Sequence, residues 1–434
     1  MKIIDTIKNN LGFKEWTLIQ KESLNKYNQH SEIVLYAPTG SGKTLAFLIP
    51  LVELLEKNEK QGIQALILSP TRELALQIEQ TFKSLKTDIS ITACYGGHSI
   101  KTEIQNLSAS PTIVVGTPGR ISDHLRRGNL SIDSVKYFVV DEFDKCLEIG
   151  FLNEIEHIHR EIRQLKKCFF SSATKLDEFP SFVNLKNPVY IDALNEMKQP
   201  DITYHLVQGS GEKLFLIRKM ISQFRHEPSI IFCNFREDVD GLLSFFEEEH
   251  IAVTAYHGGM EQDERERSLI KFRNGSNPIL ICTDLGARGL DIPQIKHIIH
   301  YQLPDKEDAF IHRNGRTARM SEDGSVYLFE DQIEKASYQL PSLKKMKPDN
   351  SLDYYLPDWE TVYFSAGKKD KVNKIDLVGF ICQKGGITKS DIGVISVLDN
   401  SSYVAIKADF LPDLLFELRK HKIKGQKVRI AISK

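Results

Sequence analysis

The sequence has few of the features that mark secreted, metal-binding or membrane proteins. Its six cysteines are scattered and form no Cys-x-x-Cys pair, so we expect buried thiols in a reducing compartment and no metal held by cysteine. No apolar run approaches the length of a membrane span, and the first residues lack the layout of a signal peptide. We therefore expect a cytoplasmic location and no membrane partner.

Net charge is also nearly absent. The formal charge of −1 over the whole chain carries no information about nucleic-acid binding. Residues 360–434, however, hold 14 Lys and Arg against 8 Asp and Glu. This local surplus fits an anionic partner, and an ordinary solvated basic surface is the alternative.

Apolar, β-rich runs recur along the chain in two series, separated by a polar stretch near 195–201. The first series comprises 32–36, 65–68, 112–115, 137–140 and 168–170, and the second comprises 229–232, 253–256, 279–282, 297–300 and 325–329. Continuous rather than alternating apolarity is typical of strands buried on both faces of a parallel sheet. Because 434 residues are too many for one core, the sequence predicts several domains. We expect two α/β parallel-sheet domains at 1–197 and 198–340, a connector at 341–359, and a small unit at 360–434.

Residues 37–44, Ala-Pro-Thr-Gly-Ser-Gly-Lys-Thr, are the most informative stretch. They follow the apolar run 32–36, and a buried strand that turns through small residues into a helix presents backbone N–H groups to an anion. In such a phosphate cradle Lys43 reaches the outer phosphates and Thr44 holds Mg²⁺. Ala37 stands where the usual pattern has Gly, a small change that leaves the prediction in place. The other loop residues expected to bind the nucleotide are Thr39, Gly40, Ser41 and Gly42.

Two acids, Asp141 and Glu142, come directly after the run 137–140. Ligands of open α/β sheets lie at the carboxyl ends of strands. Asp141 there would support Mg²⁺, and Glu142 would orient and deprotonate the attacking water. Acids also cap the turn between a strand and a helix, but the cradle upstream favours the catalytic interpretation.

Arginines cluster at 312–319. Phosphoryl transfer needs positive charge where the γ-phosphate becomes more negative, and Arg313, Arg316 and Arg319 are candidates to supply it. A solvated basic helix face is the alternative. An ATP site closed across two domains would need such donors and would couple hydrolysis to domain closure.

The chain resembles the DEAD-box ATP-dependent RNA helicases, whose motifs occur here in the family's order over about 12–319. The resemblance implies two tandem RecA-like domains and the cofactors ATP and Mg²⁺. Gly12-Phe13 with Thr17 and Gln20 resembles the motif that reads adenine, and Ser172-Ala173-Thr174 resembles the motif that couples hydrolysis to unwinding. By this resemblance the ATP residues include Phe13, Thr17, Gln20 and Asp291, with Arg316 and Arg319 on the γ-phosphate, and the coupling residues are Ser172, Thr174 and Asp144.

The same resemblance implies contacts to the RNA backbone from both domains. Small residues allow close approach to phosphates and arginines add charge, so a strand is held without its bases being read. Holding one strand bent across both domains would open a short duplex locally. The residues assigned to RNA are Pro70, Thr71, Arg72, Gly97, Thr117, Pro118, Gly119 and Arg120 in the first domain, and Gln262, Arg265 and Thr283 in the second.

The chain departs from the family pattern at several positions. Phe143 replaces Ala in the acidic motif, and Ala318 replaces Gly between two arginines. Trp16 and Leu18 replace two prolines of the adenine motif, and no aromatic residue lies in 1–11. These departures leave the affinity for ATP and the selectivity for adenine open.

The tail has the order strand, helix, strand, strand, helix, strand. The predicted elements are 361–364, 375–382, 393–397, 403–406, 411–421 and 427–432. This order suggests an RNA-recognition-motif-like sandwich with one open sheet face. Tyr363 and Tyr403 fall where such a sheet presents stacking aromatics, although they could be ordinary strand residues, and loop and basic-edge recognition fits better.

The tail also resembles the C-terminal domain of the DbpA-like bacterial subgroup. The resemblance implies a tether to a hairpin of large-subunit ribosomal RNA, and a pre-ribosomal particle as partner. Such a tether raises the effective concentration of nearby duplexes. Its basic residues here are Lys368, Lys369, Lys371, Lys422 and Lys424.

Other functions are compatible with parts of this pattern. An ATP-gated RNA clamp or scaffold without productive unwinding needs the same motifs. A DNA helicase is disfavoured by the adenine motif, the Ser-Ala-Thr motif and the RNA-type tail. We expect a monomeric RNA helicase.

Overall fold

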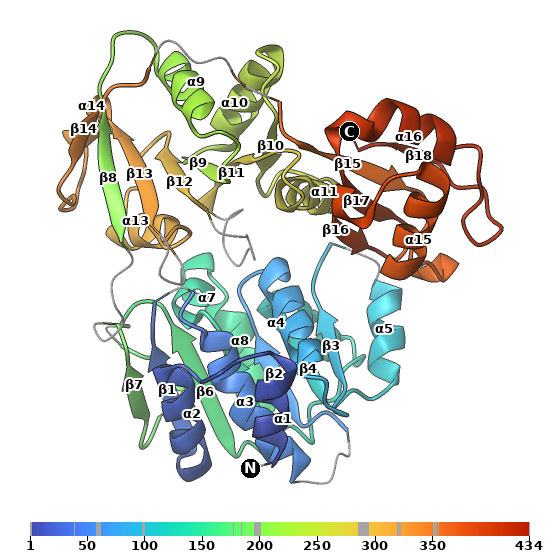
Figure 1. Cartoon of the computed structure of the whole chain (residues 1–434). Coiled ribbons are helices and arrows are strands. Elements are labelled where there is room, and N and C mark those ends of the chain that lie inside the picture. The colour runs from blue at the N-terminus through green and yellow to red at the C-terminus, as the bar shows by residue number, and fades with distance from the viewer. Residues whose placement is uncertain are drawn as a thin grey trace. The chain divides into compact units, whose positions relative to one another are not determined.

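The computed structural model describes residues 2–38, 40–57, 62–97, 100–176, 178–183, 185–194, 201–284, 295–318, 323–349, 354 and 356–433. By its contacts the chain divides into two compact units, and the boundary expected between residues 197 and 198 lies outside the described residues. Figure 1 shows both units, coloured along the chain. None of the helices in these ranges combines the length and the apolarity that a membrane span requires.

The first unit is built on a parallel sheet of seven strands. They are β1 (Glu32–Tyr36), β2 (Ala65–Leu68), β3 (Ile91–Cys94), β4 (Ile113–Gly116), β5 (Tyr137–Val140), β6 (Lys167–Ser172) and β7 (Val189–Asp192). Their order is β3-β4-β2-β5-β6-β1-β7, and each neighbouring pair is parallel. All five apolar runs of the first series are therefore strands, as predicted.

Helices cover both faces of this sheet (Figure 1). They are α1 (Lys2–Asn10), α2 (Leu18–Gln29), α3 (Lys43–Glu56), α4 (Arg72–Ser84), α5 (Ile100–Ser108), α6 (Pro118–Arg126), α7 (Phe143–Ile149) and α8 (Leu152–Glu161). One core cluster contains Phe47 and Phe169, and the other contains Phe138, Phe143 and Phe170. Neighbours in β6 thus point to opposite cores, which explains why the run is apolar throughout.

The second unit contains another seven-stranded parallel sheet. Its strands are β8 (Ile202–Val207), β9 (Ser229–Cys233), β10 (Val253–Tyr256), β11 (Ile279–Thr283), β12 (His297–His300), β13 (Gly324–Phe329) and β14 (Lys344–Met346), in the order β10-β11-β9-β12-β13-β8-β14. The described helices around it are α9 (Lys213–Gln223), α10 (Arg236–Glu248), α11 (Gln262–Arg273), α13 (Glu307–Asn314) and α14 (Glu330–Ile333). All five runs of the second series are strands here.

The segment 341–359, which the sequence predicts as a connector, is partly built into folded elements. Residues Lys344–Met346 form β14, which pairs with β8 at the edge of the sheet. An edge strand pairs on one side only, and exposed lysines protect its free side, so no apolar run announces it. At the other end of the segment, Trp359 is already the first residue of the next strand.

The rest of the second unit is a small antiparallel sheet with two main helices. Its elements are β15 (Trp359–Phe364), α15 (Lys374–Gly385), β16 (Ile392–Val397), β17 (Ser402–Lys407), α16 (Leu411–Leu418) and β18 (Ile430–Ile432), with the sheet order β16-β17-β15-β18. The predicted order of strands and helices is confirmed. The second helix ends at Leu418, three residues before the predicted end at His421.

One face of this small sheet is partly covered rather than open. Asn274, just after α11, donates from Nδ2 to Thr361 Oγ1 at 3.0 Å, and the hydroxyls of Ser276 and Thr361 share a hydrogen bond of 2.5 Å. Tyr363 and Tyr403 lie on the same face as Thr361, and their ring centroids are 5.5 Å apart. The sheet face expected to be open therefore packs, in part, against the neighbouring domain.

Candidate nucleotide and RNA sites

The loop between β1 and α3 has the backbone of a phosphate cradle. Gly40 and Gly42 have φ values of +82° and +93°, which glycine adopts without steric cost. Lys43 is the first residue of α3 and is buried. Its Nζ donates to the carbonyls of Ala37 and Pro38 at 2.8 and 3.0 Å. The lysine is thus held at the loop, where an anion would meet it.

Two further details of the loop fit a bound phosphate. Ser41 Oγ is buried and has no hydrogen-bond partner among the described residues. The Ala37 N–H donates to the carbonyl of Ser172 at 3.1 Å, which attaches the loop to the end of β6. Thr44 follows Lys43 in α3 and is half-buried. A buried hydroxyl without a partner is costly unless a ligand satisfies it.

The expected adenine motif lies against this loop. Thr17 precedes α2, and its backbone N–H donates to Gln20 Oε1 at 2.9 Å. The Nε2 of Gln20 donates to the carbonyl of Gly42 at 3.4 Å, and a Cβ on Gly42 would lie only 2.7 Å from it. Phe13 is exposed, and its ring meets Trp16 edge-on. The structure therefore joins Thr17 and Gln20 to the cradle through hydrogen bonds.

Asp141 and Glu142 extend β5 at the same edge of the sheet. Asp141 Oδ1 accepts a hydrogen bond from the Ser171 hydroxyl and one from the Glu142 N–H, the latter at 3.1 Å. Glu142 has φ +48° and ψ 55°. This left-handed conformation costs a residue other than glycine about 1–2 kcal/mol. Strain of this kind is concentrated at functional sites.

Burial makes Asp141 and Asp144 hard to ionise. It raises the pKa of Asp141 to about 6, and the negative charge of Glu142 adds to the rise. Burial and Glu142 also raise the pKa of Asp144. Carboxylates in this condition gain from a cation beside them. The donors Thr44 and Asp141 are oxygen ligands, which suit Mg²⁺.

The residues assigned to coupling are in direct contact. Asp144 Oδ2 accepts from Thr174 Oγ1 at 3.0 Å, and the Thr174 N–H donates to Ser172 Oγ at 3.2 Å. This contact connects the acidic helix α7 to the segment after β6. Phe143, which replaces Ala in the family pattern, is fully buried against Phe170, with the ring centroids 5.1 Å apart.

The first RNA segments follow β2 and β3. Thr71 caps α4, its Oγ1 accepting from the Leu74 N–H at 3.2 Å. The guanidinium of Arg72 lies over Gly96 and Gly97, where a Cβ on Gly97 would be 2.1 Å from Arg72 Nη1. Gly97 also has φ +97°. The positive φ favours glycine at this position, and the lack of a side chain leaves room for the Arg72 guanidinium.

The third RNA segment, Thr117-Pro118-Gly119-Arg120, follows β4. Pro118 is the first residue of α6, where its missing N–H costs nothing. The backbone N–H of Arg120 donates to the Thr117 carbonyl at 3.0 Å. Thr117 and Pro118 are buried, whereas Gly119 and Arg120 are partly accessible.

The strand order divides the carboxyl edge of the first sheet into two halves. All segments that follow parallel strands lie at one edge of the sheet. The nucleotide residues follow β1, β5 and β6, which are neighbours, whereas the RNA segments follow β2, β3 and β4 on the other half. Along the chain β2, β3 and β4 lie between β1 and β5, so the nucleotide strands become neighbours only in the folded unit.

In the second unit, Arg313 organises the candidate site. It is buried, and its guanidinium binds both carboxylate oxygens of Asp284 at 2.5 and 2.9 Å. It also donates to Asn234 Oδ1 and to the Gln302 carbonyl, each at 2.8 Å. Arg313 therefore joins the ends of β9, β11 and β12. The sequence predicts Arg313 as a candidate to supply positive charge to a phosphate, and the structure gives it a bidentate carboxylate partner.

The structure also describes four other predicted residues of the second unit. Arg316 is buried, and its backbone N–H donates to the Arg313 carbonyl at 3.1 Å. Gln262 begins α11. Arg265 Nη2 donates to the Tyr256 hydroxyl at 3.0 Å, with the guanidinium over the Tyr256 ring. Thr283 ends β11.

Comparison with known proteins now adds the family. The DEAD/DEAH box helicase family matches residues 17–179, the helicase conserved C-terminal domain matches 212–321, and the DbpA RNA binding domain matches 361–432. The ATP-dependent RNA helicase DbpA of Bacillus subtilis is 30% identical over 97% of this chain and 95% of its own length. The chain belongs to the DEAD-box RNA helicases.

Two further relatives of this helicase agree with that assignment. The ATP-dependent RNA helicase DbpA of Escherichia coli is 30% identical, over 98% of this chain and 96% of its own length. A solved structure of the DEAD-box helicase Mss116 bound to ssRNA and UDP-BeF is 26% identical, with a TM-score of 0.71, over 81% of this chain and 79% of that one. The helicase thus has the predicted pair of RecA-like domains and is an ATP-dependent enzyme.

The basic residues of the C-terminal domain gather at one place in the helicase. Lys368 and Lys369 lie in the short helix Lys368–Asp370, and Lys371 follows it. Lys424 Nζ donates to the Lys371 carbonyl at 2.5 Å and pairs with an Asp376 oxygen at 2.7 Å. This contact brings the loop of Lys424 and Lys422 beside the first three lysines. All five are exposed.

Three predicted ATP residues, Thr39, Asp291 and Arg319, lie outside the described residues. What the sequence did not show is mainly how the predicted residues are paired. Asn234 and Asp284 hold Arg313. Pairings between residues 29 and 79 positions apart leave no local signal in a single sequence.

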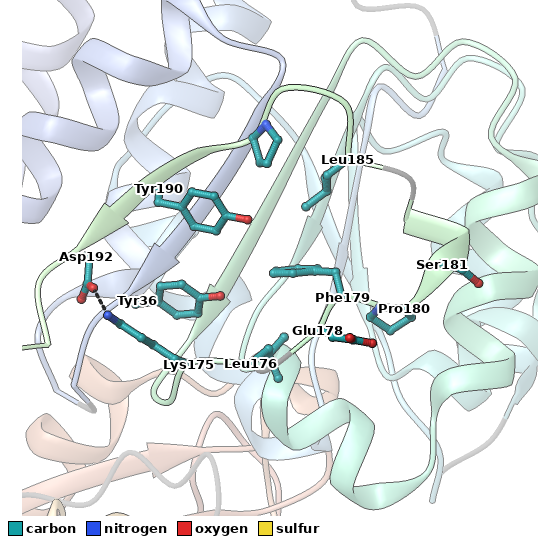
Figure 2. Close-up of a pocket in the computed structure, with 11 residues that line it drawn as sticks. Tyr36, Lys175, Leu176, Glu178, Phe179, Pro180, Ser181, Leu185, Tyr190 and Asp192 are labelled. Carbon is teal, nitrogen blue, oxygen red and sulfur yellow. Dashed lines mark ion pairs between the residues drawn. The ribbon is translucent and has the colours of Figure 1, made fainter.

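A cavity of about 600 Å³ lies beside the nucleotide half of the helicase's first sheet (Figure 2). Tyr36 and Tyr190 stack in its wall, with ring centroids 6.1 Å apart, and Lys175 pairs with Asp192. Phe179 lies on the opposite side in Figure 2. None of the described residues of the loop 37–44 lines it.

Proposed function

We propose that this helicase hydrolyses ATP at the edge of the first sheet and uses the cycle to open short RNA duplexes near a ribosomal RNA anchor. One observation supports the catalytic part above all. The cradle lysine, the acid pair and the coupling threonine, which lie far apart in sequence, meet at the ends of three neighbouring strands.

Each nucleotide residue has a proposed role that follows from its chemistry. Lys43 would bind the outer phosphates together with the N–H groups of Gly40, Ser41 and Gly42. Glu142 would orient and deprotonate the attacking water. Thr44 and Asp141 would hold Mg²⁺, which neutralises phosphate charge when bound. Gln20, fixed between Thr17 and Gly42, would read the adenine edge.

The second domain would supply positive charge to the reaction. In the role carried over from the family, Arg316 and Arg319 bind the γ-phosphate and Asp291 binds the ribose. The buried pair of Arg313 with Asp284 supports this assignment for Arg316, because it fixes the backbone three residues before it.

RNA would lie on the other half of the first sheet edge. Arg72 and Arg120 offer charge to phosphates, and Gly97 and Gly119 allow close approach. In the second domain Gln262, Arg265 and Thr283 would complete the contact. The solved Mss116 structures contain ssRNA with nucleotide analogues, which supports a single-stranded RNA product for this chain.

The C-terminal domain would anchor the helicase to a hairpin of large-subunit ribosomal RNA within a pre-ribosomal particle. The match to the DbpA RNA binding domain supports this proposal. The five exposed lysines around the Lys424 contact supply the charge, and the covered sheet face argues against base stacking on the sheet. A cytoplasmic monomer fits the bacterial source of the two DbpA relatives.

The first experiment is steady-state ATP hydrolysis with no nucleic acid, single-stranded DNA, a generic RNA, and a large-subunit ribosomal RNA fragment. Strong stimulation by the ribosomal fragment alone supports the tethered helicase. Equal stimulation by any RNA would remove the anchor, and stimulation by DNA would contradict the RNA assignment.

An ATP-gated RNA clamp is the second candidate, since it needs the same residues. A strand-release assay separates the two. The ribosomal RNA fragment is extended by a short duplex with a labelled strand. ATP is then added together with an excess of unlabelled competitor strand. Release that depends on Glu142 supports unwinding, whereas stable retention of both strands with ATP supports the clamp.

A further inference from the structure

Glu103 is a buried carboxylate that no motif assigned above includes. It lies on α5 with no exposed surface. Its Oε1 accepts the Tyr95 N–H at 2.7 Å, and its Oε2 accepts Arg120 Nε and His124 Nε2, both at 2.6 Å. Burial alone would raise its pKa, but hydrogen bonds from His124 and Arg120 hold the pKa below its usual value. Glu103 is therefore an ionised group at pH 7.

These three hydrogen bonds join two of the three RNA segments. Tyr95 directly precedes Gly96 and Gly97, on which the Arg72 guanidinium lies. Arg120 ends the segment after β4. One carboxylate thus binds both the residue before the glycine pair and Arg120. The guanidinium of Arg72 lies beside the same glycine pair.

The guanidinium of Arg120 has its shortest contact at Nε. Its Nε is bound to Glu103, whereas its Nη2 is buried and has no hydrogen-bond partner in the part of the chain that the structure describes. Its Nη1 lies 3.7 Å from Asp123 Oδ2, too far for a strong hydrogen bond. A guanidinium held through Nε presents its remaining N–H groups in a fixed direction, which suits a phosphate oxygen.

We propose that Glu103 is the positioning residue that holds Arg120 and the glycine pair in the geometry required to bind the RNA backbone. The proposal rests on the RNA-binding role proposed above for Arg120. It adds a residue that touches no RNA itself and acts through the side chain and backbone it holds.

A metal site at the same place is less consistent with the contacts. Cys94, Glu103 and His124 bring three ligand atoms within 4.8 Å of one another. However, Arg120 already occupies Glu103 Oε2, and burial raises the pKa of Cys94 to about 12. A cation would have to displace a guanidinium and a firmly held proton.

The sign of the effect on RNA binding separates positioning from simple electrostatics. Removing a negative charge close to bound RNA strengthens binding if only long-range attraction matters. Removing the group that orients an arginine weakens binding. Glu103→Ala and Glu103→Gln, made in the full chain, therefore give a clear test.

The measurement is the affinity for a labelled single-stranded RNA without a hairpin, in the presence of AMP-PNP and Mg²⁺. We expect Glu103→Ala to bind about tenfold more weakly, the effect of one lost charge-assisted contact. Glu103→Gln keeps an acceptor oxygen and is expected to lose less, about threefold. ATP hydrolysis without RNA should stay within about twofold of the wild type in both variants, because the nucleotide half of the sheet is untouched.

Non-additivity with Arg120→Ala supplies the decisive readout. If Glu103 acts through Arg120, the double variant Glu103→Ala/Arg120→Ala binds RNA no more weakly than Glu103→Ala alone. Glu79→Ala is the matched control, since Glu79 accepts the backbone N–H of Ala93 in β3 at 3.2 Å and pairs with Lys83, and among the described residues no arginine contacts it. It should leave RNA affinity unchanged.

Three outcomes would overturn the proposal: equal or tighter RNA binding by Glu103→Ala, additive losses in the double variant, or an equal loss in Glu79→Ala. Glu103→Gln, which keeps the shape of the side chain, decides the matter if the alanine variant fails to fold. A wild-type protein that binds no RNA under these conditions would instead contradict the proposed function itself.

Discussion

The two large sheets of this helicase share one strand order, but the charged residues at matching positions have different partners. The orders β3-β4-β2-β5-β6-β1-β7 and β10-β11-β9-β12-β13-β8-β14 correspond strand for strand. In each, the first strand of the chain leads to a helix that begins with lysine, Lys43 in α3 and Lys213 in α9. Lys43 Nζ donates to the carbonyls of Ala37 and Pro38 in its own loop, whereas Lys213 Nζ pairs with the Asp331 carboxylate at 2.8 Å.

The acids at the strand ends show the same contrast. In the first sheet the Asp141 carboxyl has its pKa raised by burial and by Glu142. In the second sheet Asp284 is neutralised by the bidentate Arg313. A buried acid with a raised pKa fits a ligand site, and a carboxylate bound by an arginine fits a structural role. The topology is common to both sheets, so the function depends on these pairings.

The largest expected effect is on turnover in the first sheet. Glu142→Gln removes the proposed base, and we expect RNA-stimulated kcat to fall about 1000-fold. Binding of ATP should persist, because the phosphate cradle is intact. Glu148→Gln, an acid of the same helix that pairs with Lys145, is the control in the ATPase assay. Normal turnover by Glu142→Gln would remove the catalytic role from the acid pair.

The next effect separates two arginines of the second sheet. Arg316→Ala should lower kcat about 100-fold, because the charge for the γ-phosphate is lost. RNA affinity should change little, which a binding assay in parallel checks. Equal losses of kcat and RNA affinity would mean that Arg316 contacts the RNA backbone instead.

Substitution of Arg313, in contrast to that of Arg316, should lower the stability of the fold. Arg313→Ala leaves the half-buried Asp284 without its partner and removes charge-assisted hydrogen bonds, which we expect to lower the free energy of unfolding by about 2–3 kcal/mol. Urea denaturation of the full chain measures this, with a separate signal for the second unit. A stable Arg313→Ala variant that fails only in hydrolysis would mean that Arg313 serves the reaction rather than the fold. The contrast between the two sheets would then be wrong.

Substitution of Asp141 should change the free energy of unfolding in the opposite direction. Its pKa rises from 3.8 in the unfolded chain to about 6 in the folded one, so the folded state binds the proton more tightly. The resulting destabilisation is absent below the unfolded pKa, grows between the two values, and is complete above about 6. Asp141→Asn should therefore raise the free energy of unfolding by about 2–3 kcal/mol at neutral pH and by almost nothing near pH 3.

Urea denaturation at both pH values checks the Asp141 prediction, while the ATPase assay should show lost activity. A variant less stable than the wild type at neutral pH would mean that Asp141 stabilises the fold, like Asp284. The two acids would then no longer differ.

Much of this organisation follows from the sequence alone. Continuous apolar runs predict the central strands, because a strand buried on both faces cannot alternate. Lys43, Asp141 and Arg316 stand in spacings that only a few chemistries require. Edge strands are harder: Lys344–Met346 forms β14 with two exposed lysines and no apolar run.

The pairings between distant residues were beyond sequence reasoning. The loop 37–44 marks Lys43 in the sequence, whereas nothing local marks Lys213, and only the fold brings Asp331 beside it. Glu103 looks like an ordinary helix acid until β3 and α6 are packed against it. The covered face of the small sheet depends on Asn274 and Thr361, which lie 87 residues apart.

The most direct test of the account is the affinity for a fluorescent ATP analogue in Lys43→Ala and Lys213→Ala, measured side by side with Mg²⁺. The two lysines occupy the same position in the same topology, so the substitutions are closely matched. The account predicts that Lys43→Ala loses at least about tenfold in affinity, and that Lys213→Ala binds like the wild type. Equal affinities in the two variants, or a loss confined to Lys213→Ala, would contradict it.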